Sequence, residues 1–436
     1  MKCIRCNTDN NLKDRTANMG RCSSCNHPFT FEPTAMSENI KLTDPFFAKV
    51  IADLSAINTL FFTPRQLYYL LDKRLRLRLS KTDLMTNPGG AIGCGVFIVV
   101  FFTIFIRGMF GVPLELIIPI LVGLVFTIGI WTSAANAISP YLNRRTRQKS
   151  IGTLKVMAGL MLLVGMPVGI VTKLPIVIIS SIALGISAIW LSIDRKRKQS
   201  KIFDQFLVEQ PQFDEWLNKW NGINNQPEKI LAPPQTASLP AAPNPEVTAY
   251  SFDRVVVCDS PEIAQLLISN NFHFENNCAI LAIDRYPQSI FTTTMEMLRR
   301  NPDLKVYALH DCSPEGLNLI HRLRAEEIWF PDPVIPIIDV GVLPRQIMDN
   351  VDVMTPHSTE SAQLAQQLSA DLRNSLNPVE LAWLDAGCYL ELESFSPQKL
   401  IQILQRAINE SRELAVIEGG DLLMMNPGFY MVESFG

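Results

Sequence analysis

An apolar block between residues 89 and 193 constrains this chain more than any other feature of its sequence. It contains four stretches of about the 20 residues that a helix needs to cross the hydrocarbon core of a bilayer: 89–106, 116–138, 151–171 and 174–193. In lipid, a helix can satisfy its backbone hydrogen bonds within itself. We therefore predict a four-helix transmembrane bundle, with a kink at Pro167 in the third span.

The chain carries fewer charges than a soluble protein, and its basic residues flank the apolar block unevenly. Charged residues make up 19% of the chain, against about 25% in a typical soluble domain. Lys and Arg crowd the segments before the first span, between the second and third, and after the fourth, whereas the other two connections hold only Arg107 and Lys173. Because cytoplasmic loops are rich in Lys and Arg, we predict a multi-pass protein integral to the lipid bilayer, with both termini cytoplasmic. No ionisable residue falls in the middle of a span, which disfavours a transporter.

Four cysteines near the N-terminus form two pairs with metal-ligand spacing, Cys3 with Cys6 and Cys22 with Cys25. Two such pairs are typical of a zinc ribbon, in which four thiolates surround one Zn²⁺. We therefore predict a zinc ribbon over residues 1–35. With four protein ligands the zinc is structural, and it folds a segment too short to bury a core of its own. The sequence leaves open whether the ribbon binds nucleic acid, binds a protein partner or only folds.

The segment before the membrane, residues 40–85, is predicted to be helical. Apolar residues recur at helical spacing between Thr43 and Phe61, and Thr63 followed by Pro64 is a typical helix start. Leucines then alternate with arginines, which suits a short strand or a basic juxtamembrane helix. Two interpretations follow: a small winged-helix unit, or an amphipathic lead-in that faces lipid.

After the fourth span, residues 194–223 are predicted to form a juxtamembrane helix, and residues 224–248 a linker rich in Pro and Ala. A soluble domain follows over residues 250–436. Its first half alternates strands and helices, which implies a parallel sheet with right-handed crossovers. The expected strands are 255–257, 279–283, 305–309 and 327–330, and the expected helices are 261–268, 288–300 and 315–324. The fold class is thus multidomain α/β plus membrane α.

Two aspartates follow two of these strands, Asp259 after the first and Asp311 after the third. Ligands of parallel sheets gather beyond the carboxyl ends of the strands, and carboxylate oxygens suit Mg²⁺. The alternative is that each aspartate only caps the helix that follows it.

Three runs in this domain resemble a known family: Val255-Val-Val-Cys-Asp259, Ala279-Ile-Leu-Ala-Ile283 and Val306-Tyr-Ala-Leu-His-Asp311-Cys-Ser313-Pro-Glu-Gly316. They are similar to the Toprim domain of the A subunit of type IIB DNA topoisomerases and of the related meiotic double-strand-break protein. The resemblance implies Mg²⁺-dependent cleavage of DNA by a homodimer, in which the tyrosine of one chain faces the metal site of the other. Thr63-Pro-Arg-Gln-Leu-Tyr-Tyr69 is similar to the segment that holds the nucleophile, which maps to Tyr69.

The chain departs from this family at two acidic positions. Asp259 stands where the family has Glu, and Ser313 stands where it has the second Asp of an Asp-x-Asp-x-x-Gly turn. Losing a carboxylate weakens Mg²⁺ binding, although Glu315 or Glu262 can compensate. We therefore expect a degenerate Toprim-like domain that binds nucleic acid or protein without cleavage. The alternative is an active DNA-cleaving transesterase or nuclease.

Overall fold

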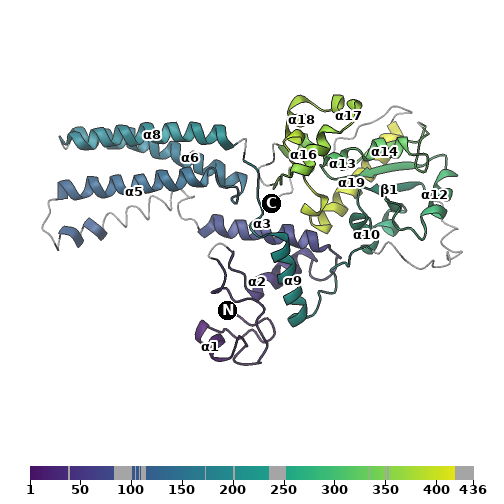
Figure 1. Cartoon of the computed structure of the whole chain (residues 1–436), viewed down its shortest axis with the longest axis horizontal. Coiled ribbons are helices and arrows are strands. Elements are labelled where there is room, and N and C mark those ends of the chain that lie inside the picture. Colours follow the sequence, from purple (N-terminus) through teal and green to yellow (C-terminus); the bar gives the residue numbers. More distant parts are fainter. Residues whose placement is uncertain are drawn as a thin grey trace. The chain divides into compact units, whose positions relative to one another are not determined.

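The computed structural model of the chain shows two compact units, one of Arg74–Leu207 and the other of Met1–Lys73 together with Val208–Gly436. Figure 1 gives the order of their elements along the chain. The residues that the structure describes are 1–37, 40–82, 101–103, 105–107, 109, 114–171, 173–199, 202–234, 252–332, 334–348, 350 and 353–417.

The first unit consists mainly of apolar helices. Three helices are long and apolar enough to cross a membrane: Ile117–Asn136, Arg144–Val171 and Pro175–Gln199. They correspond to α5 (Leu114–Asn136), to α6 (Arg144–Leu160) with its continuation, and to α8 (Pro175–Gln199). α6 contacts both α5 and α8 (Figure 1). Of the first predicted span, 89–106, the structure describes only residues 101–103, 105 and 106, and the rest lies outside the described residues.

The third predicted span differs from expectation at its start and at its kink. It begins at Arg144 rather than at residue 151, because the basic residues before the apolar stretch form the first turns of α6. A π-helical turn over Met161–Gly165 then leads into α7 (Met166–Val171). Pro167 has no N–H to donate and leaves a carbonyl one turn earlier without its usual partner. The π-helical turn is wider than an α-helical turn and accommodates the hydrogen bond that is lost at Pro167.

In the second unit, the N-terminal segment packs through aromatic rings on two helices, α2 (Asp44–Leu54) and α9 (Gln210–Asn224). The start of α3 (Pro64–Thr82) packs on α9, where Tyr68 lies 5.1 Å from Phe213 between ring centres. A short helix, α1 (Leu12–Ala17), lies within the cysteine-rich segment. Phe31 lies 5.3 Å from Phe47, and Phe47 lies 4.9 Å from Trp220 between ring centres. Residues 194–223, predicted as one juxtamembrane helix, do not form one: residues 194–199 belong to α8, residues 202–209 are not helical, and α9 begins at Gln210. α9 packs on the cysteine-rich segment.

The alternating Leu and Arg residues belong to α3, so the strand alternative for this stretch is wrong. Leu71 and Leu75 are buried one turn apart, whereas Leu77 is exposed. That pattern follows the helical period of 3.6 residues and not the strand period of two. Beyond α9, residues 229–231 continue into the segment predicted as a linker and pair with Phe62 through two backbone hydrogen bonds of 2.9 Å.

The α/β domain is built on a four-stranded parallel sheet. Its strands are β1 (Arg254–Cys258), β2 (Ala279–Ala282), β3 (Lys305–Leu309) and β4 (Ile337–Asp339), in the order β2-β1-β3-β4. The first three strands lie where the sequence predicts them. The fourth does not.

The predicted fourth strand at 327–330 is wrong, because that segment enters the core through side chains rather than through the sheet. Trp329 and Phe330 are both buried in the cluster that packs on one face of the sheet. An apolar run therefore resembles a strand here although its backbone forms a turn. β4 instead pairs with β3, with Val306 opposite Ile337.

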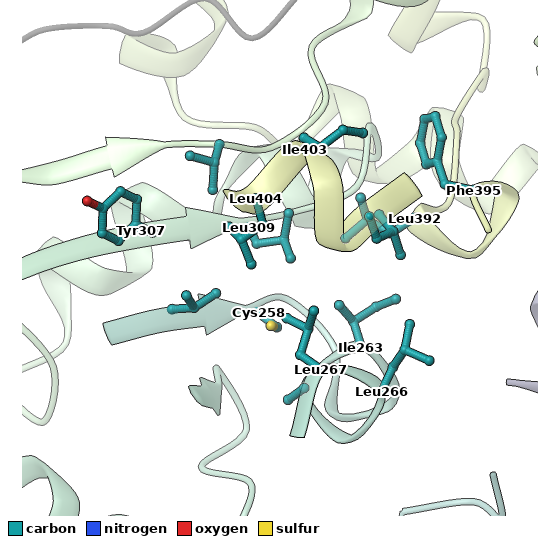
Figure 2. Packing of buried hydrophobic residues seen from close by; sticks show 14 of the residues in the cluster. Cys258, Ile263, Leu266, Leu267, Tyr307, Leu309, Leu392, Phe395, Ile403 and Leu404 are labelled. Carbon is teal, nitrogen blue, oxygen red and sulfur yellow. The ribbon is translucent and has the colours of Figure 1, made fainter. Parts of the chain in front are cut away.

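Helices cover both faces of the sheet. The helices of the domain are α10 (Pro261–Ser269), α11 (Phe272–Asn276), α12 (Phe291–Arg299), α13 (Pro314–Leu317), α14 (Leu319–Ala325), α15 (Pro344–Met348), α16 (Thr359–Gln366), α17 (Ala370–Ser375), α18 (Pro378–Asp385) and α19 (Pro397–Ile417). One face packs on α10 and α19 through Tyr307, Leu309, Leu267 and Leu404 (Figure 2). Residues from α12 and α14 pack on the other face, where Val257 is buried. Side chains of each strand thus alternate between two apolar clusters.

Candidate functional site

The four predicted cysteine ligands come together in the N-terminal segment. The Sγ atoms of Cys3, Cys6, Cys22 and Cys25 all lie within 4.8 Å of one another. Cys3 lies 3.7 Å from Cys25, and Cys6 lies 3.5 Å from Cys22. Four sulfurs bound tetrahedrally at about 2.3 Å are about 3.8 Å apart. The four cysteines could therefore hold one metal ion such as zinc.

Hydrogen bonds around the cysteines lower the pKa of Cys6 and of Cys22. A backbone hydrogen bond from His27 lowers the pKa of Cys25, but burial and hydrogen bonds with the other three cysteines outweigh it and raise that pKa to about 12. Hydrogen bonding with Thr8 lowers the pKa of Cys6 to about 6. The side-chain amide of Asn10 donates to Cys22 at 3.5 Å, while its carbonyl accepts from the backbone N–H of Ser23. Asn10, which follows the first cysteine pair, is thus hydrogen-bonded to the segment of the second pair. Donors to the sulfurs of this kind commonly orient metal ligands.

A second candidate site lies at the carboxyl ends of β1 and β3. The chain runs from β1 to β2 on one side and then crosses to β3 on the other side of β1. Crossovers in opposite directions open a crevice between the two neighbouring strands, where α/β proteins bind ligands. A cleft of about 720 Å³ lies there, lined by Asp259 and Asp311 among other residues.

The two predicted aspartates are joined by a short hydrogen bond. The backbone N–H of Asp311 donates to Oδ2 of Asp259 at 2.6 Å. Neither aspartate caps a helix, because Ser260 caps α10 and Ser313 caps α13. The capping alternative is therefore wrong at both positions, and both carboxylates line the cleft.

Ser313 and Gly316 fix the position of Asp311. The hydroxyl and the backbone N–H of Ser313 donate to Oδ1 of Asp311 at 2.6 and 3.0 Å. A Cβ atom at Gly316 would lie 2.2 Å from the same oxygen, so the turn requires glycine. Ser313, which also lines the cleft, thus holds the Asp311 carboxylate in place. Within the part of the chain that the structure describes, no group donates to Oδ2 of Asp311.

Two further acidic residues, which the sequence did not single out, line the same cleft: Glu391 and Glu393. Their segment reaches the cleft because Leu390 pairs with Cys312 through backbone hydrogen bonds of 2.9 and 3.1 Å. Glu315 also lines the cleft but is exposed on α13. Glu262 lies on α10 and does not line it.

Burial raises the pKa of three carboxyl groups in the cleft, and the charge of a neighbouring carboxylate adds to this effect for two of them. Burial, and then the charge of Asp259, raise the pKa of Asp311 to about 7. Burial, and then the charge of Glu391, raise the pKa of Glu393 to about 8. The pKa of Asp259 is also raised, chiefly by burial. Near neutral pH Asp311 and Glu393 therefore either hold protons or need a cation beside them.

One buried histidine supplies a fixed positive charge beneath the cleft. Nδ1 of His310 lies 2.7 Å from the carbonyl oxygen of Asp311, and Nε2 lies 3.0 Å from Asp339. Burial lowers the pKa of His310, but the Asp339 carboxylate outweighs this effect and raises it to about 9. Both ring nitrogens are thus engaged, which leaves His310 unable to act as a general base. Gly341 leaves room for the ring, since a Cβ atom there would lie 2.3 Å from it.

Tyr69, the predicted nucleophile, is buried beside one of the acidic residues of the cleft. Only 5% of Tyr69 is exposed. Burial, and then the charge of Glu391, raise its pKa well above the usual value for tyrosine. Arg65 makes a two-pronged ion pair with Glu391 at 2.6 and 2.8 Å and lies 5.3 Å from the centre of the Tyr69 ring. Tyr69 therefore lies beside Glu391, which lines the cleft, but is not itself among the residues that line it.

The spacing of the acidic residues in the cleft decides what kind of cation they suit. Among the described residues, only the four cysteines bring three or more ligand atoms within 4.8 Å. The carboxylates are thus too far apart to enclose an ion on their own. A cation bound by one or two of them, with water or phosphate in its other positions, fits this arrangement, and Mg²⁺ binds in that way.

Comparison with protein-family models, with curated proteins and with solved structures gave no match for this chain. The chemistry of both sites therefore rests on their residues alone.

Proposed function

We propose that this protein is anchored in the membrane and that its α/β domain binds a phosphate-bearing ligand through Mg²⁺ in the acidic cleft. The ligand that we favour is nucleic acid, in keeping with the Toprim-like sequence runs, and we propose that it is bound without being cleaved. The observation that carries the proposal is the convergence of Asp259, Asp311, Glu391 and Glu393 on one cleft.

The charge balance of the cleft supports a bound cation. Arg65 forms an ion pair with Glu391, and the imidazolium of His310 forms one with Asp339. In the described part of the chain, no Lys or Arg forms an ion pair with Asp259, Asp311 or Glu393. A divalent cation would neutralise these groups, and phosphate oxygens would fill its remaining positions.

The burial of Tyr69 argues against strand cleavage. A nucleophilic tyrosine must reach the scissile phosphate and lose its proton. Burial and the Glu391 carboxylate both hold the Tyr69 proton in place. The homodimer expected from the Toprim resemblance, and a partner for the cysteine segment, stay predictions.

The proposal that the protein is anchored in the membrane is supported by the three helices that are long and apolar enough to cross it. We propose that α5, α6–α7 and α8 span the bilayer, that a further span covers 89–106, and that both termini are cytoplasmic because Lys and Arg gather on one side. We also propose that the ion held by the four cysteines is a structural zinc.

The test of the ligand is a titration of the full chain in detergent with a fluorescently labelled oligonucleotide, with and without Mg²⁺. We expect Mg²⁺ to strengthen binding and Asp311→Asn to weaken the Mg²⁺-dependent part by more than about tenfold, since even loss of a residue that supports a metal ligand costs about 10- to 100-fold. The matched control is Asp303→Asn, which changes an exposed aspartate of the same domain. The proposal would be contradicted if the affinity for the oligonucleotide changed neither with Mg²⁺ nor in Asp311→Asn.

DNA cleavage is the second candidate, because Tyr69 lies next to a carboxylate of the cleft. A supercoiled plasmid incubated with the protein and Mg²⁺ separates the two functions. Nicking that disappears in Asp311→Asn, together with a covalent protein–DNA adduct that disappears in Tyr69→Phe, would establish cleavage. Intact plasmid with retained oligonucleotide binding supports the non-cleaving function.

A further inference from the structure

A basic hollow lies between two of the apolar helices, near the end where their charged residues gather. Its volume is about 430 Å³. The residues that line it are Lys155 on α6 and Ser192, Ile193, Lys196 and Arg197 on α8. α6 and α8 contact each other. Two helices therefore contribute three cationic side chains and one apolar side chain to a single hollow.

The carboxylate nearest to this hollow along the chain is already paired elsewhere. Asp194 lies 3.1 Å from Lys198 and 3.5 Å from Arg195. Throughout the described ranges, no carboxylate pairs with Lys155 or with Lys196. Like charges held close together repel, so the hollow is suited to an anion.

The level of the hollow along the helices indicates where this anion comes from. Lys155 lies on α6 only about 6 Å, at 1.5 Å per residue, beyond residue 151, where the apolar stretch follows the basic turns of residues 144–149. Trp190 on α8 is 64% exposed and lies about two turns before Lys196. Exposed tryptophans of membrane helices favour the level of the lipid headgroups. The cations therefore lie near the depth at which phospholipid phosphates lie.

We propose that this hollow binds the phosphate of one anionic phospholipid, whose acyl chains lie against the exposed apolar surface of α6 and α8. The ammonium groups of Lys155 and Lys196 and the guanidinium of Arg197 donate to the phosphate oxygens. Ile193 lines the hollow and Val156 is exposed on α6, and both offer apolar surface to the chains. Basic pockets between membrane helices commonly recognise lipid headgroups in this way. The inference rests on the membrane anchoring in the proposed function.

Native mass spectrometry of the full chain, released from detergent after titration with phosphatidylglycerol or phosphatidylcholine, tests this inference. We expect one phosphatidylglycerol to bind more tightly than any phosphatidylcholine. Lys155→Gln combined with Lys196→Gln should weaken this binding about 30-fold, since each lysine near an anionic lipid contributes about a factor of five. The matched control is Lys149→Gln combined with Lys198→Gln, which removes the same charge from two exposed lysines that do not line the hollow.

Three outcomes would overturn the inference: equal binding of both lipids, equal weakening in the two double variants, or displacement of the lipid by millimolar glycerol phosphate. Lys155→Arg with Lys196→Arg keeps the charge and should keep the binding. Extraction of cell membranes with alkaline carbonate separates this inference from the proposed function. Release of the chain would refute membrane anchoring and both proposals with it. A chain that stays in the membrane but does not distinguish the lipids refutes the lipid site alone.

Discussion

Replacing Asp311 with Asn should stabilise the α/β domain when Mg²⁺ is absent. In the folded protein the pKa of this carboxyl is about 7, whereas the ordinary value is 3.8. Each pKa unit corresponds to about 1.4 kcal/mol. At pH 8 the native state thus carries a cost of up to about 4 kcal/mol for keeping Asp311 ionised. Asparagine removes this cost, and its side-chain oxygen can still accept the two hydrogen bonds from Ser313.

The pH dependence gives the sign of the effect. Because the folded pKa is raised, the penalty appears as the pH rises above the unfolded value and is complete once it exceeds the folded value. Between pH 4 and pH 7 the wild-type domain should therefore lose stability relative to Asp311→Asn. Opening here means unfolding of the α/β domain. The equilibrium constant for opening should be larger in the wild type than in Asp311→Asn by about tenfold at pH 5, and by close to about a thousandfold at pH 8.

Two buried thiols next to the site can report this opening. Cys258 and Cys312 are fully buried, so a maleimide labels them only when the domain opens. Pulse labelling of the full chain in detergent, read by mass spectrometry of the two peptides, measures opening in Mg²⁺-free buffer. We expect slower labelling in Asp311→Asn at pH 8 and no change in the control Asp303→Asn. Labelling as fast as in wild type, or an equal slowing in the control, would refute the reasoning.

Three further predictions follow from the two sites. The purified chain should contain one zinc per molecule, and Cys22→Ser should lose it and expose residues 1–35 to protease; a full zinc content in that variant would exclude the cysteine site. Mg²⁺ affinity should rise by at least about tenfold between pH 6 and pH 8.5, because protons compete for carboxyls whose pKa values are about 7 and about 8; a flat profile in a titration with Mn²⁺ followed by electron paramagnetic resonance would argue against these ligands. Gly316→Ala should abolish cation binding while the domain stays folded by circular dichroism, since its Cβ displaces Asp311; unchanged affinity would show that this carboxylate is not a ligand.

The sequence alone determined the features that depend on neighbours along the chain. The spacing of Cys3, Cys6, Cys22 and Cys25 indicated a metal site, and in the fold the four sulfurs lie together. Hydropathy located three of the apolar helices. Alternation of apolar strands with helices located β1, β2 and β3, and with them the edge where Asp259 and Asp311 meet. Composition, spacing and periodicity are local properties, so a single sequence displays them.

Tertiary structure decided the features that depend on contacts between distant segments. Glu391 and Glu393 reach the cleft only because Leu390 pairs with Cys312. No pattern in the sequence marks that contact. The burial of Tyr69 likewise arises from the way α3 packs beside this segment, where Arg65 pairs with Glu391. Packing of side chains that are far apart in the chain selects among arrangements that local patterns allow equally, and the acidic cleft arises from that packing.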